Sequence, residues 1–347
     1  MATAGVHYPS SEREFRSWFR DDNDCLDYLD WLRGNGQRIC TQCGVVSPPK
    51  VVTGRVWRCP ACKARVSRTA GTIFQDTRTP LTTWFTAAWE LCVDKGGVSA
   101  SSLQRRLDLG SYQTAWMMLH RFRFAMARAG SDKLRGRVEY DETVLGGVRR
   151  GVRGRGAADK VIVAVAVEQL EDGGFGRCRL RILEDYSAPV CRAFLIECIE
   201  PSSILITDGA PQYTPATAGL YTLDSTSLSG TGQFGHDVLP GVHRIASLLK
   251  RWLLGTHQGS FGHDHLETYL DEFTFRFNRR NSSRRGLLFY RLLTLAAQTG
   301  PLHYNDFVKN SVAKKVRPEP PTTKRVSSRS LQASPAERPW RGNVPIM

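Results

Sequence analysis

The sequence predicts that the largest folded part of the chain is a mixed α/β domain, with one sheet covered by helices. Three extended segments follow one another: VEYDETV, the apolar run KVIVAVAVEQL and the alternating run RCRLRILED. Ser187 and Pro189 then begin a helix that ends near Ile199, and SILITD adds a fourth strand. A meander of strands followed by a helix and another strand is typical of a sheet with helices on its faces.

The composition favours a globular protein with a polyanionic partner. The chain has 347 residues, of which 41% are hydrophobic, enough for a sizeable core and two or three folded units. Its 48 Lys and Arg residues exceed its 33 Asp and Glu residues, which gives a formal net charge of +15. Because neutralising phosphates releases condensed counterions, this excess favours nucleic acid over a membrane surface.

The sequence carries no signal for a membrane or for export. No apolar run reaches the roughly 18 residues of a membrane span, and the first residues, MATAGVHYPSSEREF, lack the apolar core of a secretory signal. We therefore expect a cytoplasmic, nucleoid-associated protein without a membrane partner. In that compartment the nine cysteines are expected to be core residues or metal ligands rather than disulfides.

The first segment, residues 11–36, is predicted to be helical. Cys25, Leu29 and Leu32 repeat at helical spacing between residues 11 and 33, and Gly34 supplies a stop. This helical segment is expected to precede a module that contains paired cysteines.

Residues 37–70 are predicted to form a zinc ribbon. RICTQCG and WRCPACK contain two C-x2-C pairs separated by fifteen residues, and two such knuckles can complete a tetrahedral site for Zn²⁺. The predicted ligands are Cys40, Cys43, Cys59 and Cys62. Four reduced, buried cysteines are the alternative, and a rubredoxin-like iron site is a further one. The unpaired cysteines are expected in the core: Cys25, Cys92, Cys178, Cys191 and Cys198.

Residues 79–130 are predicted to form a helix-turn-helix-like region that binds DNA. Thr79 and Pro80 suit a helix start, and VSASSLQRRL and YQTAWMMLHRFRFAMAR flank the short turn DLGS. The second of these helices would offer four side chains to DNA: Gln113, His120, Arg121 and Arg123. The alternative is an ordinary helical hairpin with a solvated basic face.

Two carboxylates sit where buried strands end. Asp141 and Asp208 lie at or near the ends of VEYDETV and SILITD, where a charge is costly unless it is paired or bound to metal. Oxygen ligands of this kind suit Mg²⁺ or Mn²⁺. His243 and, seven residues later, Lys250 point from one face of a predicted helix, so they could add a metal ligand and a phosphate-binding cation.

These motifs together resemble a known family. The chain is similar to the zinc-ribbon insertion-sequence transposases of the ISXO-like group over roughly residues 15 to 295. The resemblance rests on the ribbon with the following TAGTIFQDTRTPL, and on YDETVLGG, ITDG, HRIASLLKRWLLGTH and HLETYLDEFTFRFNRR. It implies a ribonuclease-H-like catalytic domain, here residues 136–295, whose mixed sheet has helices on both faces.

The resemblance also implies roles for single residues. Asp141, Asp208 and His243 would be the catalytic metal ligands, with Lys250 beside them, in a D-D-H variant of a superfamily that typically has Glu third. Imidazole is a softer ligand and favours Mn²⁺ relative to Mg²⁺. Asp271 and Glu272 are the fallback third ligands, for which we expect surface or capping roles. Glu142, next to Asp141 on a strand, is expected on the opposite face.

The implied activity is two-metal phosphodiester transfer on double-stranded DNA by a homo-oligomer, with Zn²⁺ as a structural ion and Mg²⁺ or Mn²⁺ as the catalytic ion. The zinc ribbon and the helix-turn-helix region would bind the ends of the insertion sequence. Basic clusters would contact backbone phosphates without reading sequence, or else be solvated faces. The residues concerned are Arg149, Arg150, Arg153, Arg155, Arg276, Arg279 and Arg280, with Arg284 and Arg285 in the second cluster.

Two other functions fit the same sequence. A DNA-binding regulator with an inactive ribonuclease-H-like domain is consistent with His243 in place of a carboxylate. A structure-selective nuclease would use the same fold without joining strands. From Ser311 the chain carries eight basic and two acidic residues and six prolines, which predicts a disordered basic tail over residues 311–347.

Overall fold

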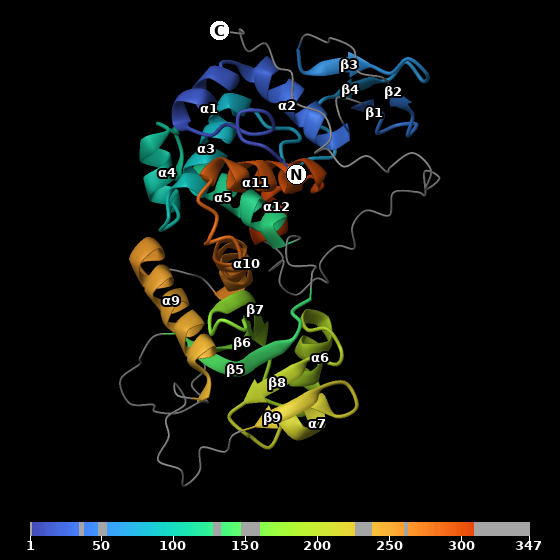
Figure 1. The fold of residues 1–347 in the computed structure, drawn as a ribbon. Helices are drawn as coiled ribbons and strands as arrows, with labels where there is room; N and C mark the ends of the chain where they lie inside the picture. The colour runs from blue at the N-terminus through green and yellow to red at the C-terminus, as the bar shows by residue number, and fades with distance from the viewer. Residues whose placement is uncertain are drawn as a thin grey trace. The chain divides into compact units, whose positions relative to one another are not determined.

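The computed structural model describes residues 2–34, 38–47, 54–127, 133–146, 160–225, 238–259 and 263–308. Its internal contacts divide the chain into two compact units (Figure 1). Unit 1 combines the chain up to Met126 with the described residues from Ser282 onward, and unit 2 runs from Ala127 to Asn281. The predicted loop arginines 149–155 and the predicted tail 311–347 lie outside the described residues.

Unit 1 is mainly helical. Its helices are α1 (Glu12–Trp18), α2 (Asp22–Gly34), α3 (Leu81–Val93), α4 (Ala100–Arg106), α5 (Tyr112–Ala127), α11 (Arg285–Gln298) and α12 (Tyr304–Val308). Aromatic rings fill the space between α1, α2, α3 and α11. Phe19 packs against Phe85 with ring centroids 4.8 Å apart, and Phe289 lies 5.4 Å from Phe15. Such ring pairs contribute beyond the area that they bury.

The single helix expected over residues 11–33 is two helices. Ser11 caps the first by accepting a hydrogen bond from the Glu14 N–H, and the helix ends at Trp18. Asp21 Oδ1 then accepts from the N–H groups of Asn23 and Asp24, at 2.8 and 3.0 Å. This side chain takes up donors that begin α2, so a new helix starts instead of the first one continuing.

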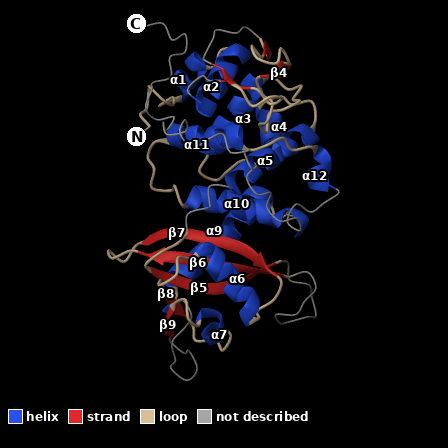
Figure 2. Ribbon diagram, turned by 90° about the vertical axis from the view of Figure 1, so that its right-hand side faces the viewer, coloured by secondary structure: helices blue, strands red, loops and turns tan. Residues whose placement is uncertain are grey.

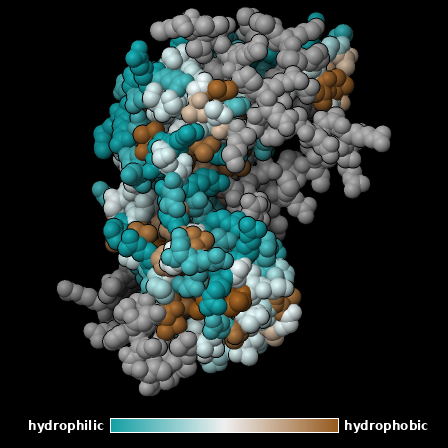
Figure 3. Space-filling model, viewed as in Figure 1, coloured by the Kyte–Doolittle hydropathy of each residue, from teal (hydrophilic) through white to brown (hydrophobic). Residues whose placement is uncertain are grey.

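Two short hairpins follow α2. β1 (Arg38–Ile39) pairs antiparallel with β2 (Val46–Ser47), and β3 (Val56–Arg58) pairs antiparallel with β4 (Arg65–Ser67). Val45, Val46 and Val56 are exposed here, and a brown patch lies over these strands in Figure 3. In the described ranges no helix is both long and apolar enough to span a membrane.

Unit 2 contains one mixed sheet of five strands in the order β7-β6-β5-β8-β9 (Figure 2). Its strands are β5 (Arg137–Leu145), β6 (Val161–Gln169), β7 (Phe175–Leu183), β8 (Ile204–Thr207) and β9 (Thr222–Ser225). β6 is antiparallel to β5 and to β7, whereas β8 runs parallel to β5 and β9 parallel to β8. The predicted meander is confirmed, and the edge strand β9 was not predicted.

Helices cover both faces of this sheet, as predicted. They are α6 (Ala188–Cys198) and α7 (Tyr213–Thr217) on one face, and α9 (Pro240–His257) and α10 (Leu266–Phe277) on the other, with a 3-10 turn at His263–His265. Alternation along β6 separates the two cores. Val163 and Val165 pack with α9 and α10, whereas Ala164 and Ala166 pack with α6. Sheet, strand order and helices fit the expected ribonuclease-H-like fold.

α11 packs in unit 1 rather than with the sheet. Its buried residues Leu288, Phe289 and Leu292 face α2 and α3. Gly286 lies so close to the chain that an added Cβ would stand 1.8 Å from the Pro9 carbonyl oxygen. The expected catalytic range 136–295 therefore runs past the end of unit 2 and into a helix of unit 1.

Candidate active site and metal centre

The four ribbon cysteines converge on one point. Their sulfur atoms all lie within 4.8 Å of one another, and the Sγ–Sγ distance is 3.7 Å both for Cys40 with Cys62 and for Cys43 with Cys59. A tetrahedral zinc ion with bonds of about 2.3 Å requires sulfur atoms about 3.8 Å apart. The donor set therefore fits Zn²⁺ in both type and spacing.

The backbone of each knuckle prepares its cysteines for this role. The Gly44 N–H donates to the Cys40 carbonyl at 2.8 Å, and the Lys63 N–H donates to the Cys59 carbonyl at 3.0 Å. Gly44 and Lys63 have φ values of 73° and 61°, which complete the tight turns. The knuckle N–H groups, that of Cys43 first, lower the pKa of Cys40 to about 7 and so favour the thiolate that binds metal.

A buried ion-pair network ties the ribbon to α2. Asp30 Oδ2 accepts from Arg38 Nε at 3.0 Å and from Arg68 Nε at 2.9 Å, and the Asp30 side chain is only 6% exposed. Arg68 also pairs with Asp27, whose side chain is 56% exposed. One carboxylate thus holds residues from both sides of the cysteine cluster. The other five cysteines are buried, as predicted.

Asp141 lies on β5, and Asp208 follows directly after β8, the neighbouring parallel strand. β5 and β8 pair Arg137 with Ile204 and Glu139 with Ile206, and the same register continued by two residues aligns Asp141 with Asp208. Asp208 directly follows β8, where Gly209 turns the chain with a φ of 80°. Asp208 Oδ1 accepts from the Ala210 N–H at 3.1 Å, which fixes the carboxylate in the turn.

The charges around Asp141 favour a bound cation. Burial is the main reason that the pKa of Asp141 is raised to about 7, and the negative charges of Glu142 and Asp208 raise it further. The Glu142 N–H, 2.7 Å from Asp141 Oδ1, acts in the opposite direction. The nearby negative charges that raise the pKa of Asp141 would also favour a hard divalent ion beside its carboxylate.

Tyr213 connects two of these carboxylates and was missed by the sequence reasoning. Its hydroxyl lies 2.9 Å from Glu142 Oε2 and 3.3 Å from Asp141 Oδ1, and the side chain is buried. Cys191 Sγ donates to Glu142 Oε1 at 3.5 Å. Glu142 therefore faces α6 and α7, as expected. The available signal was the tyrosine of PQY, shortly after ITDG.

His243 and Lys250 share the exposed side of α9. The opposite side is buried against the sheet through Val242, Ile245 and Leu249. The imidazole is therefore not part of the core. Among the described residues, the cysteine cluster is the one group of three or more potential metal ligands whose donor atoms all lie within 4.8 Å of one another. Asp141, Asp208 and His243 do not form such a group in this structure.

The arginines expected to contact DNA from α5 serve the interior of unit 1. Arg123 is 1% exposed and lies 3.4 Å from His120 Nε2, and His120 is itself fully buried. Arg121 donates to the Ile73 carbonyl at 3.0 Å and lies over the Trp84 ring. Half of the residues of α5 are buried. The burial of Arg123 contradicts both a DNA contact and the solvated basic face of the alternative hairpin, whereas the DNA contact expected of the half-buried Arg121 stays a prediction.

Three arginines of the second basic cluster, Arg276, Arg279 and Arg280, are engaged within unit 2. Arg276 pairs with Glu272 at 2.8 Å, and Glu272 is fully buried, so the surface role expected for Glu272 is wrong. Arg279 donates to the Phe275 carbonyl, and Arg280 donates to the Gly176 carbonyl, both at 3.0 Å. Of the three arginines, Arg280 keeps an exposed side chain. Arg149, Arg150, Arg153 and Arg155 lie outside the described residues.

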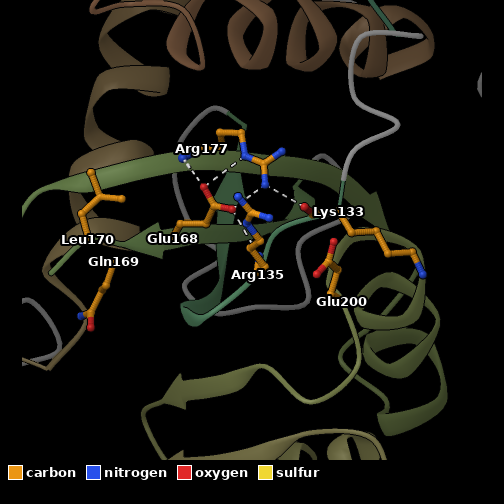
Figure 4. A pocket seen from close by; sticks show the side chains of 7 residues that line it. All are labelled: Lys133, Arg135, Glu168, Gln169, Leu170, Arg177 and Glu200. Atoms are coloured by element: carbon orange, nitrogen blue, oxygen red, sulfur yellow. Dashed lines mark hydrogen bonds and ion pairs between the residues drawn. The ribbon is translucent and has the colours of Figure 1, made fainter.

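A charged pocket lies toward the other end of β5 (Figure 4). It is lined by Lys133, Arg135, Glu168, Gln169, Leu170, Arg177 and Glu200. Charged side chains of this pocket already have partners within the protein. Arg177 pairs with Glu168 at 2.7 Å and also donates to the Lys133 carbonyl. Lys133 Nζ donates to the Ile196 carbonyl. These bonds hold the start of β5 against β6 and β7.

Comparison with known proteins gives two matches. Residues 133–278 match the model of the ISXO2-like transposase domain. The chain is also 27% identical over 278 residues to an uncharacterized protein in transposable element ISH50 of Halobacterium salinarum. This alignment covers 74% of this chain and 91% of that protein. No solved structure matches. The matched region includes Asp141, Asp208 and His243.

Proposed function

Because residues 133–278 belong to the ISXO2-like transposase domain family, we propose that this chain is the transposase of an insertion sequence. It binds the ends of its element and catalyses metal-dependent cleavage and strand transfer of DNA. The proposal rests on the position of Asp141 on β5 and of Asp208 just after the adjacent parallel strand β8, where the strand register, continued by two residues, aligns them. The net charge of +15 and the relative in a transposable element support it.

Asp141 and Asp208 are the proposed holders of the catalytic ion, with His243 as the third ligand. The mutual repulsion of Asp141, Glu142 and Asp208 supports this assignment, because a divalent cation relieves it. When bound, Mg²⁺ or Mn²⁺ supplies an activated hydroxyl and stabilises the oxygen that leaves phosphorus. The exposed position of His243 at the start of α9 leaves its ring accessible to DNA and to solvent.

The surrounding side chains orient the carboxylates and hold the DNA. Tyr213 and the Glu142 N–H bond to Asp141 Oδ1 and restrict its rotation. Lys250 is exposed on the same side of α9 as His243, and Arg244 and Arg251 are exposed beside it. We assign these cations to backbone phosphates near the cleaved bond, where their contacts position DNA without reading its sequence.

We assign recognition of the element's ends to unit 1, with Zn²⁺ as a structural ion of the ribbon. The ribbon carries exposed basic side chains at Arg58, Lys63 and Arg65, next to the exposed Val45 and Val46. This assignment replaces the expected role of Arg123 on α5, whose side chain is buried. The active species is proposed to be a homo-oligomer on DNA, which sedimentation of the protein with end-bearing duplexes will test.

The proposal is tested with purified protein, Mn²⁺ and duplexes that carry the element's ends. We expect end-specific nicking followed by strand joining, both lost in Asp141→Asn and Asp208→Asn. Binding without nicking, unchanged in Asp141→Ala, would instead favour the DNA-binding regulator. Cleavage without preference for the ends, and without joining, would favour a structure-selective nuclease.

A further inference from the structure

Glu139 is a fully buried carboxylate two residues before Asp141 on β5. Its Oε2 accepts from the Val242 N–H at 2.9 Å, and its Oε1 accepts from Gln169 Nε2 at 2.8 Å. Residues two apart on a strand share a face, so Glu139 and Asp141 belong to the face that α9 covers. Val242 lies 103 positions further along the chain. This bond therefore joins β5 directly to α9.

The bond lies in the first turn of α9. The N–H groups of a first turn have no partner within the helix, and the positive end of the helix dipole stabilises a carboxylate there. α9 has no side-chain cap of its own at Leu239 and no acidic residue in its first turn. Glu139 therefore caps α9 from the neighbouring strand.

The backbone is shaped to allow this contact. A Cβ added to Gly241 would stand 2.9 Å from Glu139 Oε2, 2.8 Å from Val167 Cγ1 and 2.9 Å from Phe175 Cδ1. Only a residue without a side chain lets the start of α9 approach the sheet this closely. The contact thus depends on two features, the buried carboxylate and the glycine that admits it.

We propose that Glu139 is a positioning residue that fixes the first turn of α9, and with it His243, relative to Asp141. The inference rests on the proposed function, since it assigns His243 and Asp141 to one metal site. The covalent path is short: His243 follows Val242 directly, and Asp141 lies roughly 6.7 Å beyond Glu139 along the strand. Glu139 itself acts through hydrogen bonds and does not bind the metal.

Three variants separate positioning from other roles. Glu139→Ala removes both bonds. Glu139→Gln keeps the shape and can keep both bonds if the Gln169 amide flips, because an amide offers one acceptor and one donor group. Gly241→Ala leaves the carboxylate in place and removes the space. The matched control is Glu168→Ala, which removes another buried carboxylate, on β6 of the same unit, that pairs with Arg177 and has no role in the proposed metal site.

Each variant is measured for Mn²⁺ binding to the zinc-loaded full chain, for Mn²⁺-dependent nicking, and for hydrogen exchange over residues 239–245. For Glu139→Ala and Gly241→Ala we expect Mn²⁺ affinity and nicking to fall about tenfold or more, with faster exchange at the start of α9. For Glu139→Gln we expect values within about threefold of wild type, because the amide can keep both hydrogen bonds that position α9. The control is expected to lose thermal stability while its Mn²⁺ affinity stays unchanged.

The outcomes distinguish the two proposals. If Glu139→Gln is as defective as Glu139→Ala, the carboxylate acts through its charge and the positioning role is overturned. The same follows if Glu139→Ala keeps wild-type Mn²⁺ affinity while the wild type nicks DNA, or if the control loses as much affinity. If the wild type neither binds Mn²⁺ through Asp141 nor nicks end-bearing DNA, the proposed function falls and this inference falls with it.

Discussion

The Tyr213 hydroxyl lies 3.3 Å from Asp141 Oδ1, although the two residues are 72 positions apart in the chain. Tyr213 belongs to α7, on the face of the sheet opposite to α9. The candidate carboxylate is therefore held from the side of the sheet that carries neither His243 nor Lys250.

Tyr213→Phe removes this contact without opening a cavity. Because the hydroxyl lowers the pKa of Asp141, its loss raises that pKa and strengthens the competition of protons with metal. We expect the Mn²⁺ concentration for half-maximal nicking at pH 7 to rise about tenfold, and less at pH 8.5. Titrations of Mn²⁺ at both pH values check this. An equal effect at the two pH values would rule out the protonation argument.

Asp141→Asn should stabilise the protein when Mg²⁺ and Mn²⁺ are absent. The folded-state pKa of Asp141, about 7, is above its unfolded value, so ionisation costs stability. This cost is absent below the unfolded pKa, grows as the pH rises toward 7 and is complete above it. We expect the variant to gain on the order of 2 kcal/mol at pH 8 and little at pH 4. Denaturant unfolding of the zinc-loaded protein at the two pH values measures the difference, and adding Mn²⁺ should favour the wild type alone.

Cys59→Ser should abolish stoichiometric zinc binding. Since thiolate–zinc bonds supply much of the folding free energy of a small ribbon, the cysteine hairpins should unfold while unit 2 keeps its structure. Zinc analysis of the purified chain should give one ion in the wild type and none in the variant. Cys92→Ala is the matched control, because this buried cysteine lies outside the cluster. Zinc retained by Cys59→Ser would refute the four-cysteine site.

Asp30→Ala should destabilise unit 1 strongly. The change leaves Arg38 and Arg68 buried without their shared carboxylate, and breaking a buried pair costs about 3–5 kcal/mol. Asp27→Ala removes a partner of the same Arg68, but from an exposed position, and should cost less than about 1 kcal/mol. Urea unfolding followed by tryptophan fluorescence compares the two variants. Similar losses would show that burial does not decide the contribution of these pairs.

Lys250→Ala should weaken DNA binding, whereas Arg123→Gln should lower thermal stability. Lys250 is exposed on α9, so its loss should weaken DNA binding and reduce the slope of log affinity against log salt by about one. Arg123 is buried, and its replacement should lower the melting temperature without changing that slope. Binding titrations at several salt concentrations, with thermal melts, check both. A reduced slope in Arg123→Gln would return α5 to the DNA interface.

The central strands could be predicted because buried strands consist largely of apolar residues, which are visible as apolar or alternating runs in the sequence. β6 is almost continuously apolar and lies inside the sheet, and the alternation of β7 gave its two faces. The edge strand β9 has the sequence TLDS and is mostly exposed, so it carries no such pattern. Its pairing with β8 follows from the position of the strand rather than from the preferences of its residues.

The candidate site was predicted only where recognisable strands marked it. Asp208 directly follows β8, whereas Asp141, expected at or near a strand end, lies in the middle of β5. The bond from Tyr213 to Asp141 and the bond from the Val242 N–H to Glu139 join positions that local periodicity does not relate. At Arg123 the sequence predicted an exposed side chain, whereas this arginine is buried. A cluster of arginines predicts a solvated face, whereas this guanidinium lies in the interior of unit 1 beside His120.

The polypeptide passes through the helical unit twice, before Ala127 and again from Ser282, so the sheet unit is an insertion within it. A stop codon shortly after Asn281 would spare every strand and the whole family-matched segment, yet it would delete α11 and uncover the aromatic core around Phe85. Copies of the gene truncated at that point should therefore encode proteins that aggregate, even though their catalytic residues are intact.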